Sequence, residues 1–232
     1  MRYAFAMVAC LLFAGAHAGA IERSTRGLPE LGPPPQGEAQ WVARSMRHNG
    51  LPMTLKSFHS RLSADGVLRH YETQTKHGST RESMRSRRGA WQVLAIREAR
   101  FFITIHARDL PSGSIGTIVV TAHPGDDTMS LATRFPLPPT VHIVNLQQYE
   151  DEGERAEHIS VLSPRAPHLE AFSCAQLLRR KGWRLIQDAP AATIERGHVI
   201  EAQKGTAHAR LTFMPDRSGV GGTAIVIVWK KV

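Results

Sequence analysis

The sequence predicts an α+β fold made of two tandem repeats, each a helix packed on an antiparallel sheet in the order β-α-β-β-β. The first observation behind this prediction is an internal similarity. The segment SGSIGT at 112–117 aligns with SGVGGT at 218–223, 106 positions later, and an apolar run follows each copy. The segment at 68–71 also aligns with that at 169–172, 101 positions later. The second observation is that each copy combines one helical pattern with several strand-like patterns.

These patterns divide the chain into five parts. We expect a signal peptide at 1–20, a Pro-rich flexible lead at 21–40, a first α+β module at 41–122, a connector and hairpin at 123–163, and a second α+β module at 164–232. Both separate sheets and one sheet shared by the two modules are compatible with the patterns.

The N-terminus has the composition of an export signal. Arg2 supplies the positive charge, residues 4–14 are almost wholly apolar, and Ala-His-Ala at 16–18 suits a signal peptidase. The apolar stretch is too short for a membrane span. We therefore predict a periplasmic protein that is not an integral membrane protein. The sequence GPPPQG at 32–37 predicts an extended tether after the signal.

In the first module, Ser63 is the expected N-cap of a helix with Asp65 in its first turn. The polar stretch 75–89 predicts a long exposed loop. Strands are expected at 53–58, 91–96, 101–106 and 116–122, and the alternation at 101–106 is the clearest in the chain.

In the second module, a hairpin is expected from strands at 141–146 and 159–162, with an acidic turn at 150–157. A helix then begins with Ser163 as N-cap and Pro164 in the first turn, and it ends at Gly182. Its apolar stripe consists of Leu169, Phe172, Leu177 and Leu178. Strands are expected at 183–186, 199–202, 211–213 and 224–229.

The charge balance favours acidic partners. The chain has 29 Lys and Arg against 20 Asp and Glu, a formal net charge of +9. Two basic clusters are the candidate contacts with a partner or polyanion: Arg81, Arg85, Arg87 and Arg88 in the predicted loop, and Arg179, Arg180 and Lys181 at the predicted helix end. The loop has few aromatic residues, so nucleic acid is not the expected partner. A protein of the cell envelope is expected first, and an anionic surface second.

No catalytic motif is present, so the sequence predicts no catalytic residue, metal or cofactor. It contains no G-x-S-x-G, and the glycines at 219–222 lack the Lys and helix of a phosphate loop. Among the histidines, His123 with Asp126 and Asp127 comes nearest to a metal cluster, and an Asp-rich turn explains it better. Cys174 is expected to be a buried small hydrophobic residue rather than a reactive thiol.

The leading hypothesis is therefore a non-enzymatic periplasmic interaction protein, an accessory of an envelope secretion, pilus or outer-membrane assembly. The alternative is a binding or inhibitory protein of the immunity type, or a receptor for an anionic ligand. A third hypothesis is a hydrolase whose dispersed residues include His106, His123, Asp126 and Asp127.

Overall fold

A computed structural model describes residues 27–74, 82–98, 100–123, 131–151, 154–191, 197–216 and 222–231. The predicted signal peptide, Arg81, Asp126 and Asp127, and most of the second Ser-Gly motif lie outside the described residues.

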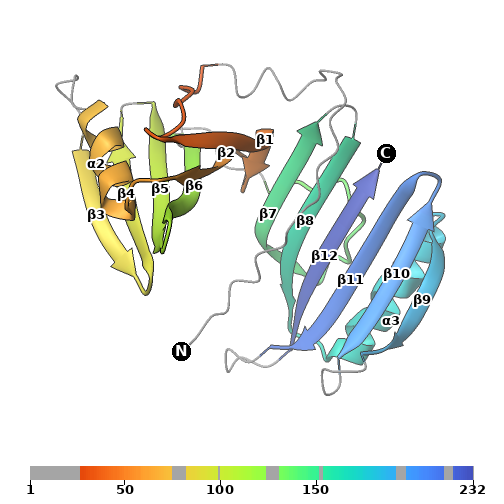
Figure 1. The fold of residues 1–232 in the computed structure, drawn as a ribbon. Coiled ribbons are helices and arrows are strands. Elements are labelled where there is room, and N and C mark those ends of the chain that lie inside the picture. Colours follow the sequence, from red (N-terminus) through yellow and green to blue (C-terminus); the bar gives the residue numbers. More distant parts are fainter. Residues whose placement is uncertain are drawn as a thin grey trace.

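The described chain forms one antiparallel sheet of twelve strands with two short helices (Figure 1). The strands are β1 (Gly37–His48), β2 (Leu51–Ser60), β3 (Glu82–Arg88), β4 (Trp91–Arg97), β5 (Phe101–Leu110), β6 (Gly113–Ala122), β7 (His142–Asp151), β8 (Glu154–Ser163), β9 (Arg184–Pro190), β10 (His198–Lys204), β11 (Ala207–Pro215) and β12 (Thr223–Lys231). The helices are α2 (Ala64–Gln74) and α3 (Pro167–Arg180).

The predicted fold class is therefore wrong. Instead of an α+β chain of helix-on-sheet repeats in the order β-α-β-β-β, the protein has a single sheet in the order β3-β4-β5-β6-β2-β1-β7-β8-β12-β11-β10-β9. The helices contribute only 11 and 14 residues. Most strands have seven to twelve residues, longer than the apolar runs that predict them, because their ends are polar and partly exposed.

The two halves of the sheet meet at β1 and β7, and this seam is short. Only three pairs join the strands, Met46–Tyr149, Arg47–Gln148 and His48–Gln147. Asn49 extends the seam, because its backbone N–H donates to the Leu146 carbonyl (2.7 Å) and its Oδ1 accepts from the Leu146 N–H (2.8 Å). Asn49 and Gly50 also form the tight β1–β2 turn, with Asn49 at φ 50°. The strand order on the two sides of the seam is symmetric.

Each half has its own apolar core beneath one helix. In the first half, α2 packs on β4, β5 and β6, and the fully buried Tyr71 lies among the core residues. In the second half, α3 packs on β9 to β12, and Phe213 and Leu211 are fully buried. The segment 131–141 closes this second core with the buried side chain of Phe135. Figure 1 shows the two helices at opposite ends of the molecule.

Residues 27–36, which composition predicts to be a flexible lead, pack against the first half. The Lys56 ammonium donates to the Glu30 carboxylate (2.7 Å) and to the Leu31 carbonyl (3.0 Å). The Tyr71 hydroxyl donates to the Gly32 carbonyl (2.8 Å). These bonds hold the prolines in place, and residues 37–40 belong to β1.

The helix ends agree with the sequence in part. Ser63 caps α2 as predicted, because its Oγ accepts the Gly66 N–H (3.2 Å). Gly182 follows the last turn of α3 as predicted, and its N–H donates to the Arg179 carbonyl. The predicted start of α3 is wrong: Ser163 ends β8, and its hydroxyl donates to the buried Glu170 carboxylate (2.7 Å). The helix begins at Pro167.

The structure aligns the two repeated segments SGSIGT and SGVGGT differently from the sequence comparison. Gly113 and Gly222 open the last strand of each half at positive φ, 135° and 104°. A Cβ on Gly113 would lie 2.1 Å from the Ser60 carbonyl oxygen, and one on Gly222 would lie 2.1 Å from the Ser163 carbonyl oxygen. Structurally equivalent glycines are therefore 109 positions apart rather than 106.

Two further predictions concern single segments. The predicted loop at 75–89 contains β3, an edge strand whose seven residues are all exposed, so no apolar alternation marks it. Cys174 is buried as predicted, and burial raises the pKa of its thiol to about 12. In the part of the chain that the structure describes, neither helix has the length and apolar character of a membrane span.

Candidate functional site

The predicted basic contacts lie at two opposite ends of the molecule. Strand β3, which carries the first cluster, is one edge of the sheet. Helix α3, whose end carries the second cluster, packs near the other edge, on β9 and β10. The two clusters therefore do not form one surface.

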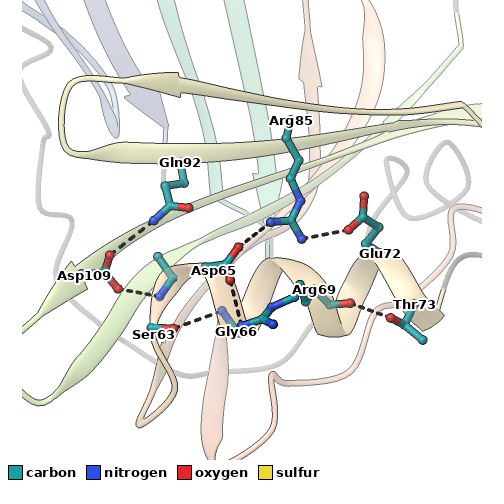
Figure 2. A network of polar contacts seen from close by, with 10 residues as sticks. Ser63, Asp65, Gly66, Arg69, Glu72, Thr73, Arg85, Gln92 and Asp109 are labelled. Atoms are coloured by element: carbon teal, nitrogen blue, oxygen red, sulfur yellow. Dashed lines mark hydrogen bonds and ion pairs between the residues drawn. The ribbon is translucent and has the colours of Figure 1, made fainter.

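In the first cluster, Arg85 is occupied within the protein (Figure 2). Its guanidinium donates to Asp65 (2.6 Å) and to Glu72 (2.8 Å), both on α2. Asp65 also pairs with Arg69 (2.9 Å). Arg85 therefore attaches the edge strand β3 to the helix, which leaves little of its charge for a partner.

The other two described residues of this cluster point to different faces of β3. Arg87 lies on the same face as Arg85 and donates to the Gly89 carbonyl (3.3 Å). Arg88 lies on the opposite face, near His106. The pKa of His106 is lowered mainly by its own burial and also by the positive charge of Arg88. Alternation along the strand thus divides the cluster.

At the end of α3, two of the three predicted side chains, those of Arg180 and Lys181, have no polar partner among the described residues. Arg179 pairs with Asp188 (3.3 Å), and Lys181 accepts a bond from Lys204 at its carbonyl (2.7 Å). No hydrogen bond or ion pair involves the Arg180 side chain in the described ranges. Its exposed guanidinium is available to a ligand.

The solvent-facing side of α3 is unusually apolar. Phe172 is 62% exposed and Leu169 is 45% exposed, although both belong to the predicted apolar stripe. Of that stripe only Leu178 is fully buried, and Leu177 is partly buried. The buried face consists largely of small residues, Ala171, Cys174 and Ala175, which let the helix lie close to the sheet. The larger apolar side chains are thereby left in solvent.

A pocket of about 300 Å³ lies beside Phe172, between α3 and the segment 138–140. Its apolar lining comes from Pro138, Pro139, Phe172 and Leu177, and Arg165 and Arg180 also line it. Arg165 donates to the Ser173 hydroxyl (2.8 Å) and lies 4.0 Å from the fully buried Glu170 carboxylate. No carboxylate lines this pocket in the described structure.

We call this surface the α3 docking surface and define it by Leu169, Phe172, Leu177, Arg165 and Arg180. Only Arg180 is among the predicted contact residues. A sequence signal for the other residues does exist: α3 carries two sets of apolar residues at helical spacing, one of small and one of large side chains. Ala171, Cys174, Ala175 and Leu178 follow helical spacing by themselves, which leaves the larger Leu169 and Phe172 on a different face.

Of the residues named in the hydrolase hypothesis, the structure describes His106 and His123. Among the described residues, no group of three or more His, Cys, Asp or Glu side chains could hold a metal ion. The His123 ring stacks on Phe102 with a centroid distance of 5.0 Å. Its proposed companions Asp126 and Asp127 are outside the described ranges.

Comparison with known proteins gives one distant similarity. No protein-family model matches the chain, and no curated protein matches it. Among solved structures, the chain is similar to a chain in the crystal structure of MucB in complex with MucA(peri). The identity is 12%, the match covers 80% of this chain and 85% of that chain, and the TM-score is 0.16. A TM-score this low supports no conclusion about fold or function.

Proposed function

We propose that this protein is a non-enzymatic interaction protein of the periplasm, and that its α3 docking surface binds an acidic amphipathic segment of a protein partner. The partner belongs to an envelope assembly such as a secretion system, a pilus or the outer-membrane machinery. The N-terminal signal pattern supports the compartment. The exposure of Phe172 beside a pocket that two arginines line is the observation that carries the binding proposal.

The apolar part of the surface supplies affinity. An exposed aromatic side chain next to a pocket is the usual anchor of a protein–protein contact, since a few such residues dominate binding energy. Leu169 lies one helical turn from Phe172, so the two present a continuous strip along α3. A helical segment that lies along this strip would insert an apolar side chain beside Pro138 and Pro139.

The charged part selects an acidic partner. In the described chain the Arg180 guanidinium has no polar partner, and the Arg165 guanidinium contacts only the Ser173 hydroxyl and, at 4.0 Å, a carboxylate. The fully buried Glu170 cannot meet an incoming group. A segment with Glu or Asp beside its apolar face would gain bidentate contacts with guanidinium groups.

The test is a selection of random displayed peptides on the exported chain, residue 21 onward. We expect the selected peptides to share acidic residues that flank aromatic or aliphatic residues at helical spacing. Their binding should fall at least tenfold for Phe172→Asp and for Arg180→Glu, because each change removes one element of the surface.

Arg87→Glu is the matched control, since it makes the same charge change at the opposite edge of the sheet. It should leave binding unchanged. Selected peptides without acidic enrichment, or equal binding by Phe172→Asp and the unaltered protein, would contradict the proposal.

A further inference from the structure

A second pocket, of about 260 Å³, lies at the seam between the two halves of the sheet. Arg47 reaches it from β1, directly across from Gln148 on β7. Arg155 reaches it from β8 and Arg134 from the segment 131–141. We call it the seam pocket. Three arginines line it, and none of them is among the contact residues predicted from the sequence.

One carboxylate in the seam pocket is fully committed to internal hydrogen bonds. Glu157 is 4% exposed and accepts from the Gln148 amide (2.8 Å) and from the Trp229 indole Nε1–H (2.9 Å). It also accepts from the Thr133 hydroxyl and from the Arg134 backbone N–H (3.4 Å). These bonds hold the segment that carries Arg134, and they do not involve its guanidinium.

The other carboxylate is committed to one arginine. Glu150 accepts from Arg155 through Nη2 (2.8 Å) and Nε (3.0 Å), across the β7–β8 hairpin. Among the described residues of the lining, Arg155 compensates the charge of Glu150, whereas the donors around Glu157 are neutral. Three arginines thus stand against two carboxylates, a formal net charge of +1.

Arg47 and Arg134 are left without a carboxylate partner in the described structure. Among the described residues, the Arg47 side chain donates only to the Gly50 carbonyl (3.3 Å), and the Arg134 guanidinium has no hydrogen-bond partner. Both are attached to backbone that is held in place, Arg47 by the β1–β7 register and Arg134 by the Glu157 bonds. Only the two side chains, and not the backbone that carries them, then have to be ordered when an anion arrives.

We propose that the seam pocket binds a small oxyanion, a phosphate or a carboxylate group, with Arg47 and Arg134 as its cationic ligands. Guanidinium forks match both groups in geometry. The volume, about 260 Å³, lies just below the range of ligand pockets, about 300–1,000 Å³, and so suits a single anionic group. Because Arg47 belongs to one half of the sheet and Arg134 to the other, the bound anion would link the halves across their short seam.

The test follows the Trp229 indole N–H resonance of ¹⁵N-labelled protein, identified with a Trp229→Phe variant. Inorganic phosphate and acetate are titrated separately, and chloride is titrated at equal ionic strength. We expect a saturable shift with phosphate or acetate and none with chloride. The Arg47→Gln/Arg134→Gln variant should weaken the apparent affinity at least tenfold while keeping a dispersed, folded spectrum.

Arg210→Gln is the control, because Arg210 is exposed and already pairs with Glu201 on the neighbouring strand. It should bind as the unaltered protein does. The comparison of phosphate with acetate distinguishes the two sources of the anionic group. An absent shift, an equal response to chloride, or an unchanged affinity in the double variant would overturn the proposal.

Discussion

At the residue scale, Gly113, the first residue of β6, is a position where any side chain would be strained. An alanine Cβ there would lie 2.1 Å from the Ser60 carbonyl oxygen, and the residue would also have to adopt φ 135°. Backbone atoms block the Cβ, so no rotamer can relieve the contact. We expect Gly113→Ala to lower the free energy of unfolding by more than about 3 kcal/mol.

Gly205 is the matched control for this prediction. It also has positive φ (57°), but nothing lies within 4 Å of its Cβ position. Gly205→Ala should therefore cost only about 1–2 kcal/mol. Urea unfolding of both variants measures the difference, and equal losses would show that the Ser60 contact does not matter.

Three partly buried histidines give the protein a pH dependence at the residue scale. Burial lowers the pKa of His48 and His158, and burial together with Arg88 lowers that of His106. In the unfolded chain each has its ordinary pKa of about 6.5. As the pH falls below that value, the unfolded chain takes up protons that the folded chain does not, so stability decreases.

The measurement is the free energy of unfolding at pH 7.5 and at pH 6.0, a window above most carboxylate titration. We expect lower stability at pH 6.0. The variant His48→Gln/His106→Gln/His158→Gln should reduce this difference, and an unchanged difference in the variant would refute the assignment.

At the element scale, the attachment of β3 to α2 depends on Arg85. Among the described strands, β3 pairs only with β4, and its seven residues are all exposed. The Arg85 side chain is 32% exposed and pairs with two carboxylates of α2. Partly exposed pairs of this kind contribute about 0.2–1 kcal/mol each, and salt screens them.

We therefore expect Arg85→Gln to increase hydrogen exchange at the β3 amides, by a factor that corresponds to about 1 kcal/mol at low salt. The effect should shrink at high salt. Arg87→Gln, which removes only a bond to the Gly89 carbonyl, should leave exchange in β3 unchanged. Equal effects of the two substitutions would mean that the α2 carboxylates do not hold the strand.

Helix α3 shows which element properties could be predicted from sequence. Its end at Gly182 could be predicted because the signal is local. Its buried face could not be predicted from hydrophobicity alone. The close approach to the sheet requires Ala171 and Ala175 at the contact, and the larger Phe172 then faces solvent. The part of the candidate site that the sequence did not indicate, the surface around Phe172, follows from this orientation.

At the scale of the whole molecule, the strongly alternating strands could be predicted and the single sheet could not. The register of β1 shifts twice, between Trp41 and Ala43 and between Ala43 and Met46, so its alternation is broken and the strand escapes detection. The Asn49-Gly50 turn was the available signal for the β1–β2 hairpin. The β1–β7 seam rests on three residue pairs that are distant in sequence, and no local pattern encodes it.

The order of the strands in the whole sheet decides where the two basic clusters lie, and the sequence does not reveal that order. From sequence, Arg85 belongs to an exposed loop of the first module and Arg180 to the end of the helix in the second module. In the sheet they lie near opposite edges. Arg85 pairs with two carboxylates of α2, whereas the Arg180 side chain has no ion pair among the described residues. The seam pocket was missed for a related reason: Glu157 falls in an acidic stretch that composition assigns to a turn, yet it lies inside β8.

The most direct test of the account is site-specific photo-crosslinking in cells that export the protein, with the reactive residue at position 172 or at position 87. We predict that position 172 captures one envelope protein through an acidic amphipathic segment, identified by sequencing the crosslinked peptide, and that Arg180→Glu abolishes the product. Capture of the same segment from position 87, or of a segment without acidic residues, would contradict the assignment of α3 as the docking surface.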